Sequence, residues 1–204
     1  MFRNILWIII VLSLSQCKKP IEENIKKVIL SKNEPTDSLH FPKTFFVDGF
    51  DFPVGKPNAQ GYYNAQKFGE NNHLGEDWNA NTGGNTDLGD SIYAIANGYI
   101  VETRDYKGGW GKVIRIIHKM PDNHYLESLY AHCDSITVSN NIFVKKGQKI
   151  GTIGTADGRY LAHLHLELRN QINMPLGKGY DDNKEGYINP TQFINKNRKV
   201  NKIH

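Results

Sequence analysis

Short apolar runs separated by turn residues make up most of the chain after about residue 45. Their lengths and alternation are those of β-strands, and a sustained 3.6-residue period is almost absent. We expect strands in these ranges: 92–102, as two apolar runs joined by Asn97-Gly98; 112–118; 124–132; 149–153; and 162–169. Because turn residues such as Pro121-Asp122-Asn123 separate neighbouring strands, the pattern predicts antiparallel sheets.

The clearest strand is the segment 162–169, which reads AHLHLELR. Because side chains alternate between the faces of a strand, His163, His165 and Glu167 share one face and three leucines share the other. The two imidazoles would lie about 6.5–7 Å apart. One could therefore bind a metal while the other sits over its open coordination position. A polar outer face or a hydrogen-bonded histidine pair would produce the same pattern, and Glu167 could either orient a ligand or be solvated.

A second polar element is His73-Leu74-Gly75-Glu76-Asp77. If this loop curls around Gly75, the imidazole of His73 and the carboxylate of Asp77 can converge on one point. Zinc accepts both donor types, and catalytic zinc sites combine three protein ligands with water. These two residues and one further histidine would complete such a set. A surface loop with unrelated polar residues is the alternative.

The remaining histidines carry weaker signals. His132 follows Tyr130-Ala131 at the end of a predicted strand, and a lone histidine there would usually be structural. His118 and His124 flank the predicted hairpin loop and are expected to be exposed, whereas His40 and His204 lie in tails, so none of these four is assigned to a site. Cys133 is expected to behave as a small apolar residue, with metal ligation as the alternative because it adjoins His132.

The N-terminus has the features of a targeting segment. Arg3 precedes the apolar run 5–14, which is too short for a membrane-spanning helix and fits the apolar region of a signal peptide. Leu14-Ser15-Gln16-Cys17 then resembles a bacterial lipobox, although Gln16 departs from the usual small residue. We expect lipid attachment at Cys17, export across the inner membrane and anchoring in the cell envelope. The absence of an acidic residue directly after Cys17 favours the outer membrane. Ordinary secretion with cleavage elsewhere is the alternative.

The 204 residues leave room for one domain with its own core. We expect a signal peptide over 1–17, a polar tether over 18–44, the folded domain over 45–195 and a basic tail over 196–204. Asn189-Pro190 has the composition of a helix start and predicts a short C-terminal helix. The formal charge of +4 comes from the two ends of the chain, whereas the middle is net acidic. No basic face for nucleic acid is therefore expected.

The motifs taken together resemble the lysostaphin/LytM-type zinc endopeptidases over roughly residues 50–195. They occur in this order: His73-x3-Asp77, Ala94-Ile95-Ala96-Asn97-Gly98, Gly109-Trp110-Gly111-Lys112, Leu129-Tyr130-Ala131-His132, Val144-Lys145-Lys146-Gly147-Gln148-x2-Gly151 and His163-Leu164-His165. There are two departures. Ala162 stands where Pro is common, and Cys133 stands where Leu is common. Neither departure removes a functional group, so they bear on the shape of the loops and groove.

The resemblance implies a mainly β domain in which antiparallel sheets form an open groove. It implies one zinc ion per chain, held by His73, Asp77 and His165, with His132 and His163 acting on substrate and water in roles that stay open. The implied reaction is hydrolysis of peptide bonds in peptidoglycan, in stem-peptide cross-links or in bridges. A non-catalytic module that binds the cell wall or activates a hydrolase is the alternative, and a zinc-storing lipoprotein is a third. Retention of all five residues favours the enzyme.

Overall fold

The computed structural model describes residues 40–199. The predicted signal peptide, Cys17, most of the predicted tether, the end of the basic tail and His204 lie outside the described residues. The compact unit begins at Phe41, whose ring packs edge-on against Phe143. Between residues 40 and 199, no helix has both the length and the apolar character required to cross a membrane.

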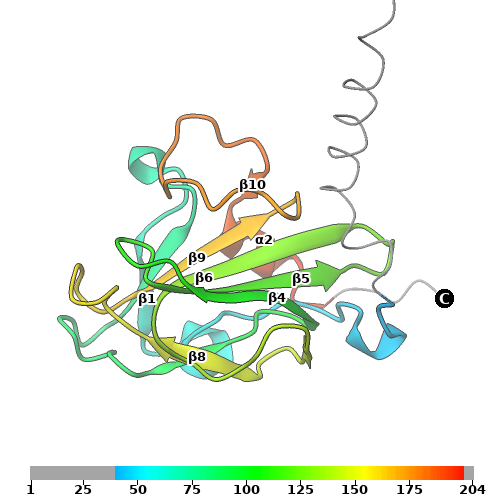
Figure 1. Ribbon diagram of the computed structural model, residues 1–204, viewed down its shortest axis with the longest axis horizontal. Coiled ribbons are helices and arrows are strands. Elements are labelled where there is room, and N and C mark those ends of the chain that lie inside the picture. Colours follow the sequence, from blue (N-terminus) through cyan, green and yellow to red (C-terminus); the bar gives the residue numbers. More distant parts are fainter. Residues whose placement is uncertain (1–39, 200–204) are drawn as a thin grey trace, which may run out of the picture. The chain divides into compact units, whose positions relative to one another are not determined.

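The domain is built on one antiparallel sheet, as expected, whose strands run in the order β1-β2-β9-β6-β5-β4-β7 (Figure 1). Three more strands extend it, since β10 pairs with β9, and β8 pairs with both β6 and β3. The bounds are β1 Tyr62–Gln66, β2 Glu76–Ala80, β3 Ser91–Tyr93, β4 Gly98–Asp105, β5 Lys112–Lys119, β6 Tyr125–Ile136, β7 Phe143–Val144, β8 Lys149–Ile153, β9 Leu164–Arg169 and β10 Tyr187–Ile188. The helical segments are η1 Lys43–Phe45, η2 Gly55–Ala59, η3 Glu70–Asn72 and α2 Pro190–Lys196.

The central strands have two differently covered faces. Leu164, Leu166 and Leu168 of β9 are fully buried in the main hydrophobic core, together with Ile194 of α2. The opposite face carries the polar residues of β9 and a smaller apolar cluster around Leu129. The predicted alternation along 162–169 is therefore confirmed, and it separates the core from the polar face.

Several predicted elements are confirmed at their predicted places. β5 and β6 form the expected hairpin, and β8 covers the predicted range. Helix α2 begins at Pro190, and the side chain of Asn189 accepts a hydrogen bond from the backbone N–H of Gln192. This is the capping arrangement that the dipeptide predicts, because Asn satisfies a free N–H while Pro has none to satisfy.

The interpretation of Asn97-Gly98 as a tight turn between two strands is wrong. β3 pairs with β8, whereas β4 begins at Gly98 and pairs with β5 and β7. Asn97 instead ties separate segments together, donating to the carbonyl of Phe46 and accepting from the N–H of Lys146. Glycine is required at 98 because an added Cβ would lie 2.5 Å from Ile116 Cγ2.

Candidate metal centre

Three donor atoms converge on one point at the polar face of β2 and β9. His73 Nε2 lies 3.0 Å from His165 Nδ1 and 3.4 Å from Asp77 Oδ1, and His165 Nδ1 lies 2.9 Å from Asp77 Oδ1. Ligands at tetrahedral zinc distances are separated from one another by about 3.3 Å. The triangle of two nitrogens and one oxygen therefore fits a zinc ion with one position left for water.

The sheet register positions two of these donors. Asp77 on β2 lies directly opposite His165 on β9, so their side chains leave the sheet on the same face. The expectation that Asp77 reaches the site through a curled loop is therefore wrong, because Asp77 belongs to a strand. Residues 77–80 alternate in polarity, but the strand is short and the polar Glu76 occupies a buried position, so the sequence did not reveal it.

The third donor, His73, lies just before β2 at the end of η3. Its ring is fully buried and stacks on Tyr180, with the ring centroids 4.9 Å apart. Gly75 allows the His165 ring to lie close to the backbone of the segment that carries His73, because a Cβ at this position would lie 2.7 Å from His165 Cε1. The glycine between the two donors thus provides the space that His165 occupies.

Glu167 determines which nitrogen of His165 faces the other donors. His165 Nε2 lies 3.2 Å from Glu167 Oε1. Because a carboxylate only accepts hydrogen bonds, Nε2 carries a proton directed at Glu167, and Nδ1 is the nitrogen that faces His73 and Asp77 and would bind a metal once its own proton is lost. Glu167 is fully buried, so the alternative of a solvated carboxylate is wrong.

The two carboxylates also change the protonation of the site. Burial lowers the pKa of His165, but the hydrogen bonds to Asp77 and Glu167 outweigh burial and raise this pKa to about 9. Burial raises the pKa of Asp77, yet the neighbouring histidines bring it below its ordinary value. Burial lowers the pKa of His73. A metal ion entering the triangle would displace a proton from His165.

His132 enters the site through a bulge in β6. Its φ is 61°, a left-handed conformation that is uncommon for residues other than glycine. The pairing of β6 is irregular here: Ala131 lies opposite His165, whereas Cys133 pairs with Ile153 of β8. The bulge places the His132 ring 5.6 Å from the His165 ring. Burial, the largest cause, and the neighbouring histidines lower the pKa of His132 to about 3, so the ring is neutral at pH 7.

His163 lies beside this donor triangle, at the mouth of the site. Its Nδ1 lies 2.8 Å from the carbonyl oxygen of Leu161 and must donate to it. In the neutral ring, Nε2 is therefore unprotonated. It faces Asp77 Oδ1 at 3.8 Å, and the His163 ring lies 4.7 Å from the His132 ring. The five residues singled out in the sequence thus lie together at one site.

The site opens into a groove of about 600 Å³, in keeping with the expected open groove. Its lining adds residues that the sequence did not identify as functional: Gln66, Tyr160, Lys178 and Tyr180. Trp110 stands in one of the quoted motifs, and its ring packs edge-on against His165. No sequence signal identifies Tyr180, because its contact with His73 depends on a loop that returns to the site after more than 100 residues.

Three other residues, His118, His124 and Cys133, differ in their exposure. His118 was expected to be exposed and is fully buried, with Nδ1 2.9 Å from the carbonyl of Asn97 and Nε2 2.7 Å from Ser128 Oγ. His118 is buried because it lies before the end of β5, where the strand is still covered on both faces. His124 is exposed, as predicted. Cys133 is buried in the main core, as expected of a small apolar residue.

Several known proteins match part of this chain in sequence. Lipoprotein NlpD of Yersinia enterocolitica is 41% identical over 81 residues, which are 40% of this chain and 78% of that protein. Murein hydrolase activator NlpD of Escherichia coli (strain K12) is 37% identical over 100 residues, which are 46% of this chain and 25% of that protein. The chain therefore spans about a quarter of the length of this second relative.

Two solved structures have the same fold. The solution structure of lysostaphin is 23% identical, with a TM-score of 0.51 over 66% of this chain and 51% of that one. The SpoIIQ–SpoIIIAH pore-forming complex is 18% identical, with a TM-score of 0.55 over 75% of this chain and 94% of that one. Residues 71–198, which carry all five converging side chains, match the sequence profile of peptidase family M23. The chain belongs to peptidase family M23.

Proposed function

We propose that the protein is a zinc-dependent endopeptidase that hydrolyses peptide bonds of bacterial peptidoglycan. The observation that carries the proposal is the complete donor triangle of His73, Asp77 and His165, with two further histidines at its open side. A protein that only stored zinc would have no need of His132 and His163 in that position. The family membership and the murein-related name of the Escherichia coli relative support peptidoglycan as the substrate.

His73, Asp77 and His165 would hold one zinc ion per chain. When bound, zinc supplies Lewis acidity toward water and toward a carbonyl oxygen. His163 would take up a proton at Nε2, because its Nδ1 is committed to the carbonyl of Leu161. His132 stays neutral at pH 7. The one N–H of this neutral ring can donate a hydrogen bond to the oxygen on which negative charge develops.

The groove suits an extended peptide. Trp110, Tyr160 and Tyr180 line it with aromatic surface, and Gly109, Gly177 and Gly179 leave its walls without side chains. Apolar walls with a few convergent polar groups are typical of ligand sites. Lys178 adds a positive charge at the rim, where a carboxylate of a stem peptide could pair with it.

The localisation is part of the same proposal. An envelope enzyme acting on peptidoglycan would be exported and held near its substrate by a lipid on Cys17. The relative from Yersinia enterocolitica is named a lipoprotein, which supports the anchor.

A second candidate function is activation of another hydrolase without catalysis. The name murein hydrolase activator, carried by the Escherichia coli relative, favours it. Purified sacculi incubated with residues 41–204 separate the two functions, with Asp77→Ala and chelator-treated protein as controls. The enzyme releases peptides identifiable by mass spectrometry, and only when metal and Asp77 are present. An activator releases nothing alone and increases release by an added murein hydrolase, whether or not Asp77 is intact.

A further inference from the structure

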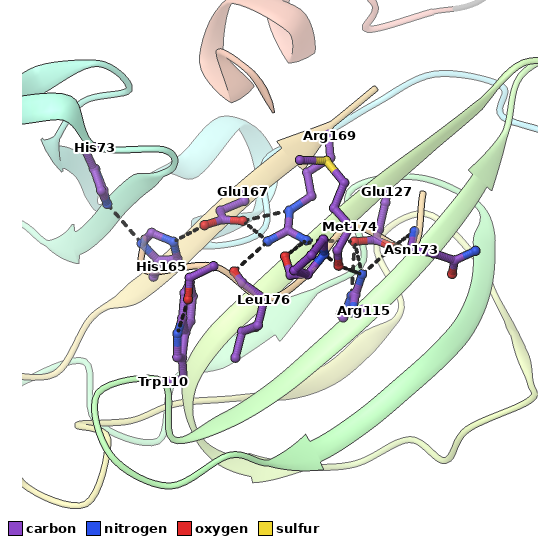
Figure 2. A network of polar contacts seen from close by, with 12 residues as sticks. His73, Trp110, Arg115, Glu127, His165, Glu167, Arg169, Asn173, Met174 and Leu176 are labelled. Atoms are coloured by element: carbon purple, nitrogen blue, oxygen red, sulfur yellow. Dashed lines mark hydrogen bonds and ion pairs between the residues drawn. The ribbon is translucent and has the colours of Figure 1, made fainter. Parts of the chain in front are cut away.

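A chain of buried charges leads from His165 away from the metal centre (Figure 2). Glu167 accepts from His165 at one oxygen, and its other oxygen accepts from Arg169 Nε and an Arg169 terminal nitrogen at 2.9 and 2.5 Å. The second terminal nitrogen of Arg169 lies 3.3 Å from Glu127 Oε1. Glu127, Glu167 and Arg169 are all fully buried, so this array is desolvated throughout.

The sheet register builds the array. Glu127 of β6 lies opposite Arg169 of β9, on the face that also carries His165. Arg115 of β5 completes it by donating to both oxygens of Glu127, at distances from 2.8 to 3.1 Å. Two arginines thus alternate with the two buried glutamates, which satisfies charges that would be costly to bury alone.

The same array holds the backbone of a loop. The N–H of Asn173 donates to Glu127, and the carbonyl of Met174 accepts from Arg115 at 2.8 Å. Arg169 donates to the next two carbonyls, of Pro175 and Leu176, at 3.3 and 3.1 Å. Four consecutive residues are therefore fixed by buried charges, and Figure 2 shows Asn173, Met174 and Leu176 of this loop beside them.

This loop continues as a wall of the groove. The carbonyl of Gly177 accepts from the indole N–H of Trp110, and the carbonyl of Gly179 accepts from the N–H of Leu74. Tyr180 then stacks on the ring of His73. Residues 173–180, here called the wall loop, thus begin on the charge array and end on a metal donor.

We propose that Arg169 is a positioning residue that couples the wall loop to His165 through Glu167. The inference rests on the proposed function in one respect, that His165 holds the zinc. The planar guanidinium of Arg169 donates to Glu167, which orients His165. It also donates to the carbonyls of Pro175 and Leu176 in the wall loop. Displacing Arg169 therefore loosens the metal ligand and the peptide-binding wall together.

Three conservative variants separate this role from simple stabilisation. Arg169→Lys keeps the positive charge between the two buried carboxylates, but an ammonium cannot reach both carboxylates and the carbonyls of Pro175 and Leu176. Glu167→Gln alters the contact with His165 while Arg169 retains Glu127 and the loop. Glu102→Gln is the matched control, because Glu102 pairs with Arg115 at the partly exposed outer end of the array.

Two measurements on purified protein test the coupling without relying on catalysis. Zinc affinity is measured by competition with a chromogenic chelator, and amide hydrogen exchange is followed by mass spectrometry in the zinc-free protein. We expect Arg169→Lys to weaken zinc binding about 10- to 100-fold and to speed exchange in peptides covering 170–181. Glu167→Gln should weaken zinc binding similarly without changing that exchange, and Glu102→Gln should change neither.

The proposal is overturned if Arg169→Lys alters only one of the two quantities, or speeds exchange uniformly across the sheet. It is also overturned if Glu102→Gln weakens zinc binding as much as Arg169→Lys does. A wild-type protein that binds zinc but leaves sacculi intact would refute the proposed function. The relative zinc affinities of the three variants would still decide whether Arg169 is coupled to His165.

Discussion

Asp77 and His165 are direct cross-strand partners on β2 and β9, with Oδ1 and Nδ1 2.9 Å apart. Residues 88 positions apart are thus aligned by backbone pairing. The geometry of the candidate metal centre is consequently a property of the sheet, and His73 completes it from the segment before β2. A site built on strands is held more rigidly than one built on loops, which suits a group that must keep tetrahedral angles.

Removal of any one donor should abolish stoichiometric zinc binding. His73→Ala, Asp77→Ala and His165→Ala each leave two protein ligands, so zinc affinity should fall at least 100-fold. Metal analysis of the purified variants after dialysis measures this. His124→Ala is the matched control, because His124 is exposed. Full zinc occupancy in all three ligand variants would show that the metal is held elsewhere.

The two remaining histidines should separate catalysis from metal binding. His163→Ala and His132→Asn are expected to retain one zinc per chain, while turnover of peptidoglycan falls by a factor of about 100 or more. Asparagine is chosen at 132 because it tolerates the left-handed backbone better than alanine. Metal content and peptide release are measured on the same preparations. Loss of zinc in either variant would mean that the ligand set is wrong, and normal hydrolysis in the double variant would refute the enzymatic proposal.

Gly75→Ala should damage the metal centre without removing a donor. The new Cβ would lie 2.6 Å from the carbonyl oxygen of Leu166 and 2.7 Å from His165 Cε1, so β9 or the segment before β2 must shift. We expect a loss of stability of about 1–3 kcal/mol together with weaker zinc binding. Gly83→Ala is the comparison, because its φ of +75° strains alanine while its Cβ would meet nothing within 4 Å, so it lowers stability without a clash at the site. Equal zinc affinity in the two variants would contradict the steric explanation.

His118 should make the zinc-free domain sensitive to acid. Burial lowers the pKa of His118 to about 4, whereas the unfolded chain titrates near 6.5. Between these values the unfolded state binds the extra proton, so stability falls as the pH is lowered from about 6.5 to 4. The contribution of His118 from pH 7 to pH 5 is about 2 kcal/mol. Urea unfolding at both pH values measures it, and His118→Gln should flatten the dependence by that amount. The same change in slope for His124→Gln would assign the effect to other groups.

The lipid anchor can be tested on Cys17, although that residue lies outside the described part of the chain. Cys17→Ser should move the protein from the detergent phase to the aqueous phase when cells are extracted and phase-separated. Cys133→Ala is the matched variant, since Cys133 is buried in the core and cannot carry the lipid. Unchanged partition of Cys17→Ser would count against the anchor and would point to the unusual Gln16 as the reason.

The sequence by itself determined the features that depend on local spacing. Alternation along 162–169 placed His163, His165 and Glu167 on one face, and Asn189-Pro190 marked the start of α2. The ordered motifs indicated the family, and four of them supply residues that the structure brings together at the site. These inferences need only the periodicity of a strand, the capping of a helix or the identity of a side chain.

Only the tertiary structure decided the features that depend on pairing between distant segments. Asn97-Gly98 has the composition of a hairpin turn, yet the runs on its two sides pair with different strands. β3 pairs with β8, whereas β4 pairs with β5. The bulge that directs His132 into the site arises where the pairing of β6 changes from β9 to β8. The burial of Glu167 depends on Arg169 and on the wall loop that Arg169 holds. Burial and strand partners are set by the whole sheet, so no local pattern contains them.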